Sequence, residues 1–240
     1  MALMSSEGWL FLLRWIHFLA GITWIGLLYY LNFAQVPFFA ETEPGVRSGA
    51  QQKLLPRVMW WFRWGAMITF LSGWIYLLHY WLGLRGINDP GTWKILLGGL
   101  LGSIMWANVW FVIWPRNKIV IQNALDTAAG KPANPAAAAA GARGGLASRT
   151  NVVLSIPMLF FMGAASHFAF FTPTARPAKI TMLVVFLIVL AIVEGNAVVG
   201  PATPDKASAG KKLLSTVKGT LWAGFVVTAI LVIALKIIFP

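Results

Sequence analysis

Histidine supplies the candidate redox chemistry of this sequence, since cysteine is absent. The 240 residues include three histidines, His17, His79 and His167, and no cysteine. Without cysteine there can be no disulfide, no iron–sulfur cluster and no c-type haem attached through CxxCH. Neutral imidazole can still ligate a haem that is not covalently attached. The histidines therefore predict a metal centre, with haem b as the predicted cofactor.

Glycine spacing singles out two of the three histidines. Gly21 follows His17 by four residues and Gly163 precedes His167 by four, so each glycine shares the helical face of its histidine. A glycine at such a place leaves room for a flat ring between two helices. We therefore expect His17 and His167 to be the axial pair, with His79 at the rim as a spare ligand, a propionate partner or a bystander.

Arg14 extends this candidate site toward the surface. It lies three residues before His17 and so points the same way, where a haem propionate would need a cation. A structural alternative stays open for each histidine, because a membrane histidine can also lie at the interface or bond to a neighbouring helix. Gly21 and Gly163 could likewise serve only close helix packing.

A second set of polar residues interrupts otherwise apolar stretches; its members are Glu194, Arg63, Asn108, Asn196 and Asn32. An acid inside a membrane span is costly unless it is paired or hydrated, so Glu194 is a functional candidate. We expect Arg63 to be its ion-pair partner. The group could mark a proton uptake path or a pocket for a quinone head group, and a purely structural Glu–Arg or Glu–Asn contact stays open.

The elements that must position these residues are membrane helices. The sequence is 58% apolar and 11% charged, and a span of the hydrocarbon core takes roughly 20 mostly apolar residues. The long continuous runs lack the alternation of barrel strands. We expect an all-α bundle in a single membrane domain, 1–240, with six spans at about 9–34, 58–83, 93–114, 151–171, 178–200 and 215–238.

The connections between the spans predict the orientation. Long connections at about 35–57, 115–150 and 201–214 share one side, and short ones at about 84–92 and 172–177 share the other. Of the 19 lysines and arginines, 13 lie on the long-connection side and 6 on the other, which predicts that the long connections are cytoplasmic. The chain is then a multi-pass protein of the bacterial inner membrane with both termini in the periplasm.

Two further expectations concern the connections and the net charge. Residues 127–147 are rich in Ala, Gly and Pro, so the connection at 115–150 is expected to be a mobile cytoplasmic loop that includes one helical turn. The net charge of +12 is explained by attraction to anionic lipid of the bilayer and requires no nucleic acid. The sequence has no phosphate-binding loop and no GxSxG elbow, which argues against nucleotide-driven and hydrolase functions.

Four tryptophan-rich blocks carry a family resemblance: RWIHFLAGITWIG (14–26), WFRWGAMITFLSG (61–73), GLLGSIMWANVWFVIWPRNK (99–118) and SRTNVVLSIPMLFFMGAASHF (148–168). Over roughly residues 9 to 200 the chain resembles the urate oxidase N-terminal domain family, the membrane part of bacterial urate hydroxylases. In that family a cytochrome c domain follows and would accept electrons. The resemblance implies that His17 and His167 are linked to haem.

The sequence departs from that pattern because it has no CxxCH cytochrome segment. The electron partner is therefore expected to be a cytochrome c on a separate chain, and other membrane subunits are expected as partners. Three functions stay open: a b-type haem subunit for electron transfer, within a respiratory complex for example; a urate-oxidising enzyme with a partner cytochrome; and a haem-free structural subunit. Whether the chain is itself an enzyme is left undecided.

Overall fold

The fold is a bundle of long apolar helices. The computed structural model describes residues 5–168, 172, 176–203 and 207–239, and every regular element in these ranges is helical. Six helices are long and apolar enough to cross a membrane, namely Ser6–Glu41, Pro44–Arg85, Pro90–Ala128, Ala137–His167, Arg176–Val198 and Val217–Ile238. The predicted all-α bundle with six spans is therefore confirmed, and by helix length and hydropathy the chain is a multi-pass membrane protein.

The first three spans are composite rods. The first joins α1 (Ser6–Tyr29), the π-helical segment η2 (Tyr30–Gln35) and α2 (Val36–Glu41). The second joins α3 (Pro44–Tyr76) and the π-helical η3 (Leu77–Arg85). The third joins α4 (Pro90–Ala107), the π-helical η4 (Asn108–Ile113) and α5 (Trp114–Ala128). At about 1.5 Å per residue, rods of this length exceed the roughly 30 Å hydrocarbon core, so they extend beyond it.

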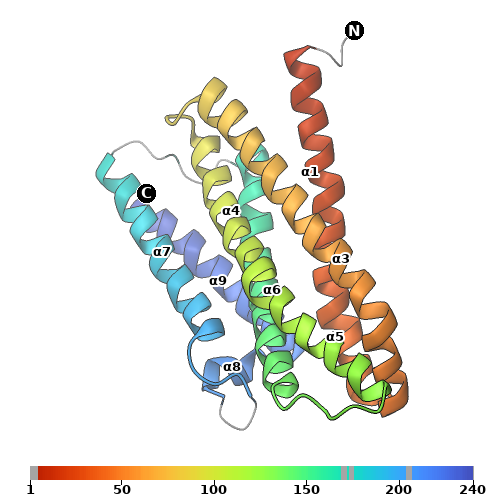
Figure 1. The fold of residues 1–240 in the computed structure, drawn as a ribbon. Helices are drawn as coiled ribbons and strands as arrows, with labels where there is room; N and C mark the ends of the chain where they lie inside the picture. Colours follow the sequence, from red (N-terminus) through yellow and green to blue (C-terminus); the bar gives the residue numbers. More distant parts are fainter. Residues whose placement is uncertain (1–4, 169–171, 173–175, 204–206, 240) are drawn as a thin grey trace.

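Four further helices complete the bundle. They are α6 (Ala137–His167), α7 (Arg176–Val198), α8 (Ala209–Leu213) and α9 (Val217–Ile238). Helix α6 packs against α4, α5, α7 and α9, whereas α1 packs mainly against α3. In Figure 1, α6 accordingly lies behind α4 in the middle of the bundle, and α1 stands at its edge.

The bundle has two distinct ends. At the terminal end, in the upper part of Figure 1, α1 begins, η3, α6 and α9 end, and α4 and α7 begin. At the connecting end lie the links 42–43 and 129–136, together with the described residues 199–203 and 207–208 between α7 and α8. In Figure 1, α2, the start of α3 and α5 form the lower right corner of this end.

The loop predicted at 115–150 is wrong over most of its length. Helix α5 continues to Ala128 and α6 already begins at Ala137, which leaves 129–136 as the link. Alanine has the highest helix propensity, and small residues allow close packing: a Cβ at Gly144 would lie 3.3 Å from Cβ of Arg116 on α5. The predicted connection at 35–57 is also mainly helical.

Some predicted boundaries lie outside the described residues. These are the end of the fourth predicted span at 169–171, residues 173–175 of the short connection that follows, and residues 204–206 of the last long connection.

Candidate functional site

The imidazole of His17 rests against α3. Its Nδ1 lies 3.0 Å from the carbonyl oxygen of Thr69 and 3.2 Å from Oγ of Ser72. A carbonyl oxygen can only accept, so Nδ1 carries the proton and donates to Thr69. Nε2 of the neutral ring is then the unprotonated nitrogen, and it makes no hydrogen bond within the described residues. This is the arrangement in which a histidine can ligate a metal.

Gly73 creates the space that the ring occupies. A Cβ at this position of α3 would lie 2.8 Å from Cε1 of His17, closer than such atoms approach in proteins, and 3.1 Å from its Nδ1. Gly21 lies at the same interface, where its Cβ would be 3.9 Å from Cγ2 of Thr69. The face of α1 that carries His17 and Gly21 is therefore the face that packs on α3.

Arg14 is held by an aromatic residue of α3. Its guanidinium donates to the hydroxyl of Tyr76 and lies 5.1 Å from the centre of that ring. Tyr76 in turn stacks on Tyr80, with 5.1 Å between ring centres. Tyr80 begins a polar cluster at the terminal end that sequence reasoning did not find.

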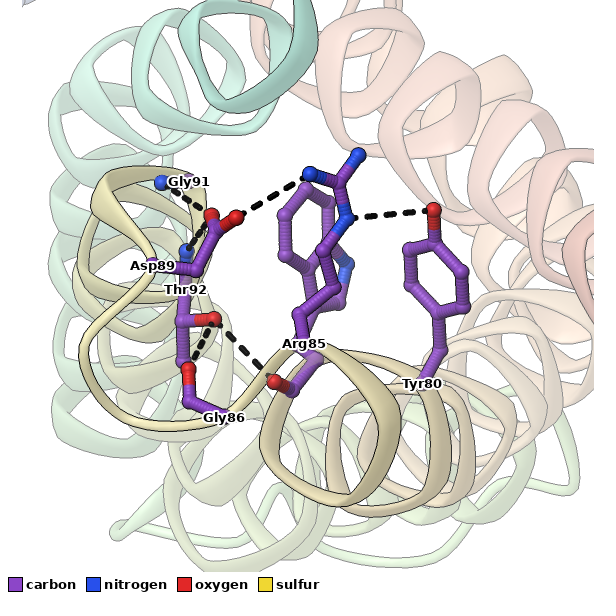
Figure 2. Close-up of polar contacts among 7 residues, drawn as sticks. Tyr80, Arg85, Gly86, Asp89, Gly91 and Thr92 are labelled. Atoms are coloured by element: carbon purple, nitrogen blue, oxygen red, sulfur yellow. Dashed lines mark hydrogen bonds and ion pairs between the residues drawn. The ribbon is translucent and has the colours of Figure 1, made fainter.

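Figure 2 shows this terminal cluster. Nε of Arg85 donates to the hydroxyl of Tyr80 at 3.3 Å, and Nη1 forms an ion pair with Asp89 at 3.0 Å. Asp89 also caps α4 by accepting from the main-chain nitrogens of Gly91 and Thr92. Asn-Asp-Pro before an apolar run is a helix-start signal, so the Asp89 cap could have been predicted, whereas its pairing with Arg85 depends on the turn between η3 and α4.

The other two histidines are exposed. His79 lies in η3, and His167 is the last residue of α6. A Cβ at Gly163 would meet nothing within 4 Å. Lys94 of α4, another residue that sequence reasoning missed, donates to the carbonyl of Phe168 at 2.9 Å and so ties down the end of α6. The axial pairing of His17 with His167 is not formed by these contacts and stays a prediction.

Within the described ranges, no group of three or more His, Asp or Glu side chains could hold a metal ion. A haem site does not require such a group, because one or two histidines are enough to ligate a haem. His17 fits that role through its fixed Nδ1 and its unbonded Nε2.

Glu194 belongs to an amide network and not to an ion pair. Nδ2 of Asn108 donates to Oε2 of Glu194 and to Oδ1 of Asn151, at 3.0 Å each. Nδ2 of Asn151 donates to the carbonyl of Met105 at 2.9 Å. Asn108 and Asn151 are both buried. The network therefore connects a fully enclosed pair of amides on η4 and α6 to a partly exposed carboxyl group on α7.

The expected Arg63–Glu194 ion pair is wrong. The Arg63 guanidinium lies 4.1 Å from the ring centre of Trp114 and 5.8 Å from that of Trp110, so it is taken up by cation–π contacts with the third span. Helix rotation explains the difference: Arg63 faces η4 and α5, whereas Glu194 reaches η4 from α7.

Asn196 is also separate from the Glu194 network. Its Oδ1 accepts from Oγ of Ser208 at 3.3 Å, and a Cβ at Gly210 would lie 2.8 Å from the same Oδ1. Asn196 thus ties the end of α7 to α8.

Two polar residues of α6 join the first span to the bundle centre. Oγ of Ser148 accepts from Nδ2 of Asn32 at 2.8 Å, and Oγ of Ser155 shares a hydrogen bond with the hydroxyl of Tyr29 at 2.9 Å. With Asn151 these serines form the α6 stripe, residues 148, 151 and 155, on one helical face. Sequence reasoning missed it, although polar residues at this spacing in an apolar helix are a recognisable signal.

A family match covers part of this arrangement. Residues 88–199 run from just before α4 to just after α7, so they include the amide network and His167. They match the family model described as urate oxidase N-terminal. This segment is therefore similar to the urate oxidase N-terminal family, in agreement with the resemblance noted in the sequence. His17, Arg14 and Arg63 lie before the matched residues. Searches among curated proteins and among solved structures found no match.

Proposed function

We propose that this membrane protein holds a b-type haem through His17 and exchanges electrons with a cytochrome c on a separate chain. The observation that supports the proposal is the His17 ring, whose Nδ1 donates to the Thr69 carbonyl while Nε2 has no hydrogen-bond partner in the described residues. Such a main-chain acceptor fixes the ring and raises the basicity of the ligating nitrogen. Bound haem would supply reversible one-electron chemistry.

His167 is the proposed second ligand. Its side chain is exposed at the terminal end, and the open space at Gly163 leaves room beside α6 for a flat ring. Arg14 is proposed to meet a propionate, because a guanidinium has five N–H donors and Tyr76 takes only part of them. His79 is proposed as a bystander, since its exposed side chain has no fixed neighbour comparable to Thr69.

The test is the visible spectrum of the purified chain, expressed with haem supplied. Dithionite-reduced minus oxidised spectra should show the sharp bands of a six-coordinate b haem. Mixing with a soluble cytochrome c would then show whether this haem becomes reduced or oxidised, which gives the direction of electron flow. A chain that purifies folded but without haem contradicts the proposal and favours a structural subunit of a larger assembly.

Urate oxidation is a second candidate, favoured by the family match over residues 88–199. In this function urate would donate electrons that pass to the separate cytochrome. Urate added to the oxidised protein should then produce the reduced haem spectrum, and xanthine, as a control purine, should not. Without urate-dependent reduction, only the electron-transfer function remains.

Glu194 is proposed as the proton-accepting group of this domain or as a hydrogen-bond partner of a quinone head group. Asn108 orients its carboxyl group, and no ion pair in the described residues neutralises it. Glu194→Gln should therefore impair turnover or assembly without changing the haem content.

We also propose that the connecting end is cytoplasmic and the terminal end periplasmic in the bacterial inner membrane. This follows from the excess of lysine and arginine at the connecting end, and it would place His17 on the side where a periplasmic cytochrome c could approach.

A further inference from the structure

A cavity of about 360 Å³ opens at the connecting end between the first span, α6 and the start of α9. Its volume falls in the range of small-molecule sites, roughly 300–1,000 Å³. Both polar and apolar residues line it. Arg149 comes from α6, Asn32 from η2, and Ser215 and Thr216 from the turn before α9.

Arg149 is the charged group of this cavity. Its guanidinium is partly buried, and within the described residues it has neither an acidic partner nor a hydrogen bond. None of the lining residues is an aspartate or a glutamate. A half-buried guanidinium without an anion is costly, because its desolvation is not offset. By contrast, Arg143, six residues earlier, donates to the carbonyls of Ala197 and Gly200.

Other polar atoms have free capacity beside Arg149. The hydroxyl of Ser215 has no hydrogen bond among the described residues, whereas that of Thr216 already accepts from the main-chain nitrogen of Gly219. The lining also includes the apolar side chains of Phe33, Val36 and Pro37 from the first span. The cavity thus combines one cation and a hydroxyl donor with a surface suited to hydrocarbon.

We propose that this cavity binds the phosphate group of an anionic ligand through Arg149 and Ser215. A planar guanidinium fork matches phosphate oxygens. The phosphate could belong to a phospholipid head group or to free phosphate. The lipid source fits the apolar lining and the position of Arg149 near the start of the apolar part of α6, where basic pockets between membrane helices bind head groups. This site is independent of the proposed haem.

The test uses the full chain and three variants. Arg149→Gln removes the charge but keeps a polar side chain. Ala40→Phe, at an exposed lining position on α2, blocks the cavity and leaves Arg149 intact. Arg57→Gln is the matched control, because Arg57 is exposed on α3 at the same end and donates to the carbonyl of Lys53 in its own helix. Far-UV circular dichroism and gel filtration show whether each variant is folded.

The lipid arm places each protein in phosphatidylcholine nanodiscs that contain phosphatidylglycerol and counts retained lipids by native mass spectrometry. Wild type and Arg57→Gln should retain one phosphatidylglycerol tightly. Arg149→Gln and Ala40→Phe should bind it at least about tenfold more weakly, the scale of one charge-assisted interaction. The second arm adds inorganic phosphate to detergent-solubilised protein and measures thermal stability.

The outcomes separate the sources. Selective lipid retention supports a head-group site, and stabilisation of wild type but not of Arg149→Gln by inorganic phosphate alone supports a free-phosphate site. Equal lipid retention by wild type and both cavity variants, together with no effect of phosphate, overturns the proposal. If Arg149→Gln fails to fold, lipid retention by Ala40→Phe is compared with that of Arg57→Gln. Equal retention by these two variants, together with no effect of phosphate, then overturns the proposal.

Discussion

The imidazole of His17 is oriented by the main chain of a helix about fifty residues away and not by its own helix. Thr69 accepts from Nδ1, and the missing side chain of Gly73 provides the space for the ring. Both features lie in the WFRWGAMITFLSG block, so two of the tryptophan-rich blocks meet at this one side chain. His17 is therefore a residue whose chemistry could be read from its type, but whose tautomer depends on a tertiary contact.

Histidine replacement should separate the three candidate ligands. His17→Ala and His167→Ala should each abolish haem retention, because each removes a proposed axial nitrogen, while His79→Ala should keep most of the haem. The measurement is the haem-to-protein ratio by the pyridine haemochrome spectrum. Equal retention by all three variants would contradict the pair, and loss in His79→Ala instead of His167→Ala would move the second ligand to η3.

Gly73 should be sensitive to a single added carbon. Gly73→Ala places a Cβ 2.8 Å from Cε1 of His17, so the ring or the helix must move. Overpacking of this kind costs typically about 1–3 kcal/mol, which should lower the melting temperature in detergent and reduce haem binding. The matched control is Gly26→Ala on α1, where the new Cβ meets nothing within 4 Å. Identical behaviour of the two variants would mean that the His17–Gly73 contact is unimportant.

At the scale of elements, α6 is the helix on which the bundle depends. Its stripe of polar residues bonds to α1, η2 and η4, and through Asn108 it reaches α7. The π-helical segment η4 begins at Asn108, and η2 contains Asn32, so two of these segments supply side chains to the α6 stripe or the amide network. π-Helical segments often occur at functional sites. The extra residue in such a segment turns the neighbouring side chains toward a new partner.

Removing the centre of the α6 stripe should destabilise the bundle. Asn151→Val leaves Nδ2 of Asn108 without one acceptor and the Met105 carbonyl without its side-chain donor. A buried group left unsatisfied costs about 1–3 kcal/mol. Thermal unfolding in detergent should show this loss, whereas Leu159→Val, at an exposed position of the same helix, should unfold like wild type. No loss in Asn151→Val would show that water or lipid replaces these bonds.

At the scale of the whole molecule, the charge distribution is asymmetric. Positive charge gathers at the connecting end, and the first three spans are longer than the expected hydrocarbon thickness. The terminal cluster of Tyr80, Arg85 and Asp89 lies at the opposite end, and His17 lies in the half of α1 nearer to that end. Electron exchange and anionic-ligand binding are thus proposed for different sides of the membrane.

Orientation can be tested directly because the sequence has no cysteine. Single replacements Ala133→Cys, in the link between α5 and α6, and Ile87→Cys, between η3 and α4, place exposed thiols at the connecting and terminal ends. In spheroplasts, a membrane-impermeant maleimide should label Cys at 87 and should label Cys at 133 only after lysis. The reverse pattern would invert the proposed topology and move the His17 site to the cytoplasm.

The sequence alone determined the helical class, the six spans and the identity of His17 and Glu194 as unusual groups, because apolar run length and residue type are local properties. Ala- and Gly-rich composition was misleading for 115–150, since it does not distinguish a loop from a tightly packed helix. Only the tertiary structure decided that His17 faces α3, that Arg63 stacks on Trp114 and that Asn108 holds Glu194. These contacts depend on the rotation and crossing of helices, which packing between distant segments sets.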